Sequence, residues 1–139
     1  MNQVYTFKKR VELYHVDGAN ILFYGQIFYF THDAFAEFLR EFGFSIKDRL
    51  EKRDFVFPVV HAEADYKGLI FLDDEVDIEL SVDKIGDSSF SICYKMRVAN
   101  NKVASANVVH AVIDGKTLEK KTIPDAFKQI LEKYYTKPR

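Results

Sequence analysis

The feature that most constrains the fold of this chain is its most apolar and aromatic stretch, residues 21–42. Apolar side chains recur there every three or four residues, which is the period of an α-helix with one buried face. The positions at this spacing are Ile27, Phe30, Ala34, Phe38 and Phe42. The pattern predicts a helix from about Tyr24 to Phe42, roughly 28 Å long, closed by Gly43. Such a helix needs a large apolar surface to cover it.

Elsewhere apolar residues alternate with polar ones, as in half-buried β-strands. Strands are predicted over residues 4–14, 58–66, 74–84, 90–98 and 103–114. Turn-forming residues separate the last three, so these should pair as antiparallel hairpins. Pro124 predicts a short final helix reaching about Tyr134. Segment 45–54 is expected to be a charged surface linker with at most one helical turn.

This order of elements predicts an α+β fold in which one long helix packs on an antiparallel sheet. With 139 residues, 47% of them hydrophobic, the chain is expected to form a single domain over residues 1–139. The outer face of the sheet is either solvated or covered by a partner subunit. The residues predicted for that face are Glu79, Cys93, Lys95 and Arg97.

Charge and cysteine content exclude several classes of protein. A net charge of -1 argues against nucleic-acid binding, which normally needs a basic face. Cys93 is the single cysteine, so an internal disulfide or a cysteine-rich metal site is not expected. The longest apolar run, 21–30, is well short of the roughly 20 residues that span a bilayer. We therefore expect a cytoplasmic protein with no membrane segment.

Asp17 is the candidate reactive group, because it lies in a small-residue loop immediately ahead of the buried helix. Gly18 and Asn20 favour a turn there. Judged by itself, this carboxylate is more typical of a structural role in a loop or at a helix cap. His15 beside the loop is either solvent-facing or next to a substrate, and His32 is expected to be a core or interface histidine.

The segment DGANILFYGQI at 17–27, a long helix, and FPVVHAEADY at 57–66 together resemble the hotdog-fold acyl-CoA thioesterases of the 4-hydroxybenzoyl-CoA thioesterase family. DDEVDI before the third strand extends the resemblance to nearly the whole chain. Within the family, the sequence is most similar to the 1,4-dihydroxy-2-naphthoyl-CoA thioesterase branch, because of DGA, Gln26 and THDAF at 31–35. Asn20, Phe23 and Gly25 depart from the usual pattern, which affects expectations about loop geometry and acyl preference more than those about Asp17.

The resemblance implies a hotdog fold, in which a five-stranded antiparallel sheet wraps a long central helix. It also implies a homodimer or homotetramer with active sites at subunit interfaces. The family's carboxylate matches Asp17, as nucleophile or general base, and its oxyanion donor matches the backbone N–H near Tyr24. Phe23 and His61 are the candidate substrate-binding residues.

Asp33 and Glu37 are reserve candidates for the carboxylate, since other hotdog thioesterases carry their acid on this helix; otherwise they belong to a solvated helix face. Basic residues are expected to hold the coenzyme A phosphates. The candidates for that role are Lys84, Lys95, Arg97 and Lys102; otherwise these residues belong to the charged surface, which is the more usual place for such side chains.

A thioester is already activated toward acyl transfer, so its hydrolysis needs only an attacking group and an oxyanion donor. A carboxylate with a pKa near about 3.9 is ionised at pH 7. We expect no cofactor and no metal, and we interpret His61, Glu63 and Asp65 as an exposed strand face. The predicted activity is hydrolysis of an acyl-CoA to free acid and CoA, preferably an aromatic one such as 1,4-dihydroxy-2-naphthoyl-CoA of menaquinone synthesis. The alternatives are a short-chain or aliphatic acyl-CoA thioesterase and a non-catalytic module that binds acyl thioesters.

Overall fold

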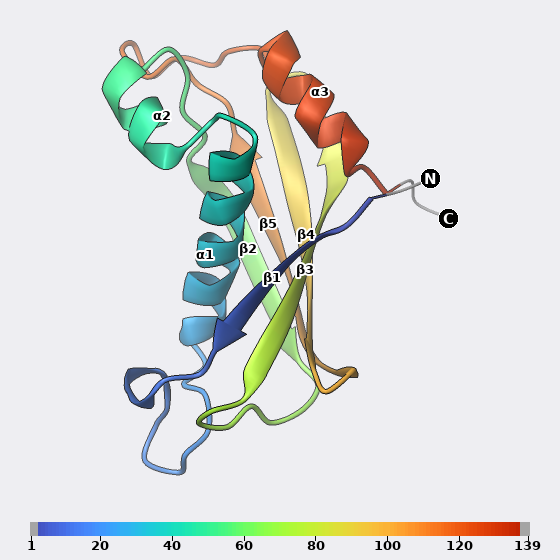
Figure 1. Ribbon diagram of the computed structural model, residues 1–139. Coiled ribbons are helices and arrows are strands. Elements are labelled where there is room, and N and C mark those ends of the chain that lie inside the picture. Colours follow the sequence, from blue (N-terminus) through green and yellow to red (C-terminus); the bar gives the residue numbers. More distant parts are fainter. Residues whose placement is uncertain (1–2, 137–139) are drawn as a thin grey trace.

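The computed structural model describes residues 3–136, which form one five-stranded antiparallel sheet and three α-helices (Figure 1). The strands lie in the order β1-β3-β4-β5-β2, so that β1 and β2 are the two edges. The elements in chain order are β1 (Tyr5–Arg10), a 3-10 turn η1 (Leu13–His15), α1 (Gln26–Glu41), α2 (Ile46–Lys52), β2 (Val59–Tyr66), β3 (Glu75–Ile85), β4 (Ser89–Val98), β5 (Asn101–Ala111) and α3 (Asp125–Lys133).

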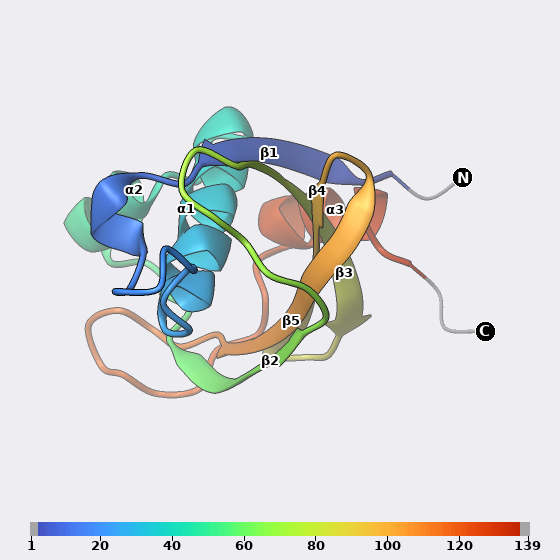
Figure 2. The ribbon, with the colours of Figure 1, turned by 90° about the horizontal axis from the view of Figure 1, so that it is seen from below.

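The sheet curls around α1, which lies between the two edge strands when the molecule is seen from below (Figure 2). The helical spacing in the sequence matches the buried face, where Ile27, Phe30, Ala34 and Phe38 are fully buried. The inner faces of the central strands are equally apolar and complete the core. Their fully buried side chains include Val76, Ile78, Leu80, Val82, Ile92 and Met96. The predicted α+β arrangement of a long helix wrapped by a five-stranded antiparallel sheet is confirmed.

The boundaries of the first two elements differ from the prediction. β1 ends at Arg10 rather than at residue 14. The chain turns there because the Glu12 N–H donates to His15 Nδ1 over 2.8 Å while the His15 N–H donates to the Glu12 carbonyl over 2.9 Å. α1 starts at Gln26, two residues later than Tyr24, because Ile21 and Leu22 take part in β-bridges and Tyr24 and Gly25 form the turn that follows.

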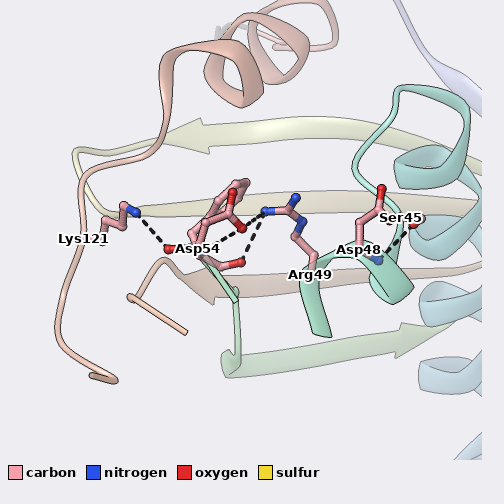
Figure 3. Close-up of polar contacts among 6 residues, drawn as sticks. Ser45, Asp48, Arg49, Asp54 and Lys121 are labelled. Carbon is pink, nitrogen blue, oxygen red and sulfur yellow. Dashed lines mark hydrogen bonds and ion pairs between the residues drawn. The ribbon is translucent and has the colours of Figure 1, made fainter. Parts of the chain in front are cut away.

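Segment 45–54 is more ordered than the predicted surface linker, because α2 occupies most of it. Ser45 caps this helix by accepting a hydrogen bond from the Asp48 N–H over 3.2 Å. Arg49 points inward and is buried, with its guanidinium 4.1 Å from the Phe55 ring centre. Its Nη1 atom also lies 2.8 Å from Oδ1 of Asp54 (Figure 3).

α3 closes the end of the sheet that lies next to the C-terminus of α1 (Figure 1). Its Phe127 is fully buried in a cluster of aromatic rings. The rings within 5.7 Å of it, measured between centres, belong to Phe44, Phe55, Phe57 and Phe90. No helix within residues 3–136 is long and apolar enough to cross a membrane.

β2 is exposed over nearly its whole length, unlike β3, β4 and β5. It pairs only with β5, and its other backbone edge is open. The pairing shifts register between Val59 and His61, opposite His110 and Val109 of β5. A bulge of this kind inserts one extra residue and changes which side chains face each way.

Candidate active site

The Asp17 loop is the tip of a short hairpin that leads directly into α1. The Asp17 N–H donates to the Ile21 carbonyl over 2.9 Å, and the Phe23 N–H donates to the His15 carbonyl over the same distance. Asn20 completes the turn with a φ of 65°, a left-handed conformation that asparagine tolerates better than most residues. The loop therefore has a defined shape, and it places Asp17 opposite Ile21 at the tip of the hairpin.

The two oxygens of the Asp17 carboxylate have different surroundings. Oδ1 accepts hydrogen bonds from the N–H groups of Ala19 at 2.8 Å and Ile21 at 3.3 Å. This is an Asx turn, in which the side chain replaces a backbone acceptor. Within residues 3–136, Oδ2 accepts no hydrogen bond, and the side chain is exposed. One oxygen thus fixes the orientation of the carboxylate while the other stays available to a substrate or water.

Backbone donors are available at the start of α1. The first helical bonds run from the Gln26 N–H to the Phe23 carbonyl and from the Ile27 N–H to the Tyr24 carbonyl. Among the backbone hydrogen bonds of the described chain, the N–H groups of Tyr24 and Gly25 take no part as donors. Unpaired N–H groups at a helix N-terminus carry partial positive charge and suit a developing oxyanion.

Tyr66, the last residue of β2, ties the helix start to the edge of the sheet. Its hydroxyl donates a hydrogen bond to the Tyr24 carbonyl. Burial raises the pKa of the Tyr66 hydroxyl, so this donor stays protonated at neutral pH. This hydrogen bond holds the main chain at Tyr24. It therefore restrains the position of the unpaired N–H of the same residue.

A cavity of about 180 Å³ lies between α1 and the β2 side of the sheet. Phe28 and Phe35 of α1 form one wall, and Val59 and Ala62 of β2 form the other. Strict alternation along the strand would put Val60 on the same face as Ala62, but the bulge at the start of β2 brings Val59 to the cavity instead. The walls are therefore apolar and partly aromatic.

Four polar side chains also line this cavity: Thr31, His32, Tyr94 and His110. The Thr31 hydroxyl donates back to the Phe28 carbonyl within the helix, over 2.9 Å. Tyr94 and His110 come from the central part of the sheet and form the floor, where each is at least 95% buried. The cavity thus combines apolar walls with a few polar groups, as small-molecule sites commonly do.

Comparison with known proteins identifies the family. Residues 11–131 match the model of the Thioesterase-like superfamily. The chain belongs to this superfamily. A 1,4-dihydroxy-2-naphthoyl-CoA hydrolase from Nostoc punctiforme is 31% identical over 128 residues, which cover 92% of this chain and 86% of the relative. The predicted family and its hotdog fold are confirmed.

Solved structures share the fold of this thioesterase-like chain at lower sequence identity. A 1,4-dihydroxy-2-naphthoyl-CoA thioesterase from Synechocystis superposes with a TM-score of 0.86 at 22% identity, covering 93% of this chain and 96% of that one. A gentisyl-coenzyme A thioesterase superposes with a TM-score of 0.80 at 23% identity, covering 91% of this chain and 98% of that one. Both likenesses extend the hotdog fold over nearly the whole chain.

Of the site residues predicted from sequence, Asp17, Phe23 and Tyr24 lie together on the hairpin that precedes α1. The rings of Phe23 and Tyr24 are 4.7 Å apart between centres, and both are largely exposed. His61 lies elsewhere: it is exposed on β2, with Nε2 2.8 Å from Oε1 of Glu63, and it does not line the cavity. A substrate contact of His61 stays a prediction.

The reserve carboxylates on α1 are both engaged in ion pairs. Asp33 lies 3.1 Å from the Lys9 ammonium of β1, and Glu37 lies 2.8 Å from the Arg40 guanidinium. Both face away from the cavity, which is lined by other residues of the helix. These contacts favour the solvated-face interpretation of the two residues.

For each histidine that flanks the site, the structure contradicts one of the two expected positions. His15 is buried against Phe30, with ring centres 5.0 Å apart, so it is not solvent-facing. Burial lowers the pKa of His15, and nearby Lys9 lowers it further. His32 is exposed in the single chain, so a core position is wrong, whereas an interface position stays a prediction.

Sequence inspection missed Tyr66, Tyr94 and His110. Each lies within a predicted strand. The alternating pattern assigns such a residue to a face of the strand but gives it no functional role. The available signal was chemical: a hydroxyl or imidazole on an otherwise aliphatic inner face needs a hydrogen-bond partner. Whether such a polar side chain faces a ligand depends on which strands lie next to one another, and only the folded chain shows this.

Proposed function

We propose that this protein hydrolyses an acyl-CoA to the free acid and CoA, with Asp17 as the reacting carboxylate. The observation that supports the proposal is the hairpin before α1: its tip carries a carboxylate with one restrained and one free oxygen, and its second strand leads to unpaired N–H groups at the start of the helix. These are the two elements that thioester hydrolysis requires.

Two chemical routes use this arrangement. In the first, Oδ2 of Asp17 attacks the thioester carbonyl carbon, the C–S bond breaks, and water then hydrolyses the mixed anhydride. In the second, Asp17 takes a proton from a water molecule that attacks the same carbon. In both, negative charge develops on the carbonyl oxygen, and the unpaired N–H groups of Tyr24 and Gly25 are the proposed donors to it.

We further propose that the acyl group is aromatic, with 1,4-dihydroxy-2-naphthoyl as the first candidate. Two observations support this choice. The cavity beside α1 has aromatic walls formed by Phe28 and Phe35, and the Nostoc punctiforme relative is named a hydrolase of that CoA ester. A role in menaquinone or phylloquinone synthesis in the cytoplasm follows from this choice of substrate.

The test is thiol release from a panel of acyl-CoA esters that includes 1,4-dihydroxy-2-naphthoyl-, benzoyl-, short-chain and long-chain aliphatic CoA. We expect the aromatic esters to be hydrolysed with the highest kcat/KM. A preference for aliphatic esters would overturn the choice of acyl group. Tight binding of acyl-CoA with no thiol release would instead indicate a non-catalytic binding module.

Asp17→Asn tests the reacting group specifically. The asparagine carbonyl oxygen still accepts the two N–H hydrogen bonds of the Asx turn, so the loop should keep its shape. We expect turnover to fall about a hundredfold or more, as for loss of a central acid–base group, with an unchanged melting temperature. Asp33→Asn is the matched control and should retain activity; the reverse pattern would assign the reaction to α1.

We propose a homodimer or homotetramer as the working assembly. The open edge and double-sided exposure of β2 support it, because an unpaired strand edge is a ready site for pairing with a second chain. Light scattering should give a mass of at least two chains, and a monomer that retains full activity would contradict the proposal.

A further inference from the structure

We propose that the Tyr94 hydroxyl and the His110 imidazole form a polar floor in the cavity beside α1 and select aromatic acyl groups that carry hydroxyl substituents. This inference rests on the proposed function, because it assigns the acyl group to that cavity. It adds a specificity determinant that lies on β4 and β5, away from the Asp17 hairpin.

Tyr94 provides the first polar group. Its side chain is 1% exposed, yet its hydroxyl takes part in none of the side-chain hydrogen bonds found among residues 3–136. The same side chain lines the cavity beside α1. Buried tyrosine hydroxyls usually have a partner, so this one is free for a ligand.

His110 provides the second polar group, and its tautomer is fixed by a neighbour. Nδ1 lies 2.9 Å from the Phe57 carbonyl oxygen. A carbonyl only accepts, so Nδ1 carries the proton and donates it. Burial lowers the pKa of His110, which keeps the ring neutral. Nε2 is then a lone-pair acceptor, it takes part in none of the side-chain hydrogen bonds found among residues 3–136, and its ring lines the cavity.

The imidazole is also held in place by aromatic rings. It stacks on Phe35 at 4.7 Å and on Phe90 at 5.0 Å between ring centres. This packing leaves the ring little freedom to turn, so the direction of its Nε2 lone pair is set before a ligand arrives. A preorganised acceptor discriminates strongly between ligands that satisfy it and ligands that leave it unpaired.

The position of the floor suits an acyl group attached to a thioester at the start of α1. Phe28 is the third residue of this helix and Phe35 the tenth. At about 1.5 Å per residue, the lining of the cavity extends from roughly 5 to 15 Å along the axis from Gly25. A planar ring entering between α1 and β2 then presents its substituents to Tyr94 as donor and to His110 as acceptor. A phenolic hydroxyl, which both donates and accepts, matches this pair.

The experiment compares 1,4-dihydroxy-2-naphthoyl-CoA with 2-naphthoyl-CoA, which has the same ring system without hydroxyls, under oxygen-free conditions. Wild type should prefer the hydroxylated ester by about tenfold or more in kcat/KM. Tyr94→Phe removes one oxygen atom and should reduce that preference about tenfold. His110→Phe keeps a ring between Phe35 and Phe90 and should also reduce it.

Tyr134→Phe is the matched control. Tyr134 is another buried tyrosine, but it packs against Phe38 and Phe42 outside the cavity. This control should leave the preference unchanged. An equal loss on both esters in Tyr94→Phe, or an unchanged preference, would overturn the proposal.

A binding measurement separates this proposal from the proposed function and needs no variant. The free acids 1,4-dihydroxy-2-naphthoate and 2-naphthoate are titrated into wild-type protein by calorimetry, and the hydroxylated acid should bind about tenfold more tightly. If aromatic thioesters are hydrolysed but the two acids bind equally, the floor does not select hydroxyls and the proposed function stands. If no thioester is hydrolysed but the acids differ as expected, the cavity assignment stands and the proposed function fails.

Discussion

The two ends of α1 contain similar residues but are held in different ways. At the N-terminal end, the aromatic rings of Phe23 and Tyr24 are exposed, and main-chain hydrogen bonds define the hairpin. At the C-terminal end, the rings of Phe38 and Phe42 pack with Tyr134 at centre distances of 5.1 to 5.6 Å. The aromatic content of a segment therefore does not by itself indicate whether it is core or site.

The difference suggests that the two ends serve separate purposes. Backbone hydrogen bonds hold the Asp17 hairpin while leaving its side chains open to a ligand, whereas close ring packing excludes water and stabilises the fold. Substitutions at the C-terminal end should therefore change stability with little effect on the chemistry. Substitutions at the N-terminal end should do the opposite.

Phe127→Ala should give the largest effect on stability. Removing this fully buried ring leaves a cavity among four other aromatic rings, so we expect a loss of about 3–5 kcal/mol in the free energy of unfolding. Urea denaturation measures it, and KM at a temperature where the variant is folded should stay near that of wild type. Leu50→Ala, at a 64% exposed position of α2, is the control and should lose under about 0.5 kcal/mol.

Arg49→Met should give an intermediate loss at the same end. The guanidinium stacks on Phe55 and lies 2.8 Å from the Asp54 carboxylate, beside the Lys121 contact to the Asp54 carbonyl (Figure 3). Methionine keeps the apolar stem but loses the cation–π contact and the hydrogen bonds. We expect the free energy of unfolding to fall by about 2 kcal/mol. An unchanged urea midpoint would mean that Arg49 contributes nothing net.

The ion pair of Asp54 also has a pH signature. Desolvation tends to raise the pKa of Asp54, but the hydrogen bond from the Phe55 N–H and the charge of Arg49 outweigh it, and the pKa is lowered. A carboxyl with a lowered folded pKa stabilises the protein above its unfolded pKa, and that stability is lost as the pH falls through the folded pKa. The difference in the free energy of unfolding between wild type and Arg49→Met should therefore become smaller below pH 4.

Tyr66→Phe tests the N-terminal end. It removes the hydrogen bond to the Tyr24 carbonyl and should loosen the oxyanion donor without opening the core. We expect about a tenfold lower kcat and a stability loss of no more than about 1 kcal/mol. Tyr29→Phe, an exposed tyrosine of α1, is the control. If Tyr66→Phe lost stability and activity in the same proportion, the role of Tyr66 would be structural only.

The smallest expected effect is a pH dependence of stability near neutrality. The pKa values of His15 and His110 are lowered in the folded chain, mainly by burial, so the unfolded chain binds more protons below about pH 6.5. Stability should fall as the pH drops from 7.5 to 5.5, and this fall should be smaller in His110→Phe. If the stability of His110→Phe fell as much as that of wild type over this pH range, His110 would not be a cause of the pH dependence.

Local patterns in the sequence determined the types and order of the elements, because helical and strand periodicity depend on neighbouring residues alone. The same patterns placed Asp17 in a small-residue loop ahead of a long buried helix. The exact start of that helix was not predictable. It depends on the Leu22 N–H reaching the Ile70 carbonyl and on the bridge between Ile21 and Phe71, both of which join segments about fifty residues apart.

Tertiary structure also decided which polar groups face a ligand. Tyr94, His110 and Val59 belong to three strands, and a one-residue bulge in β2 turned Val59 rather than Val60 toward the cavity. Arg49 lies in a segment with the composition of a surface linker, but the rings around it and the Asp54 carboxylate make its burial favourable. Periodicity assigns a residue to a face of its own element, whereas the meeting of faces from distant elements depends on the non-local hydrogen bonds and packing that form only when the chain folds.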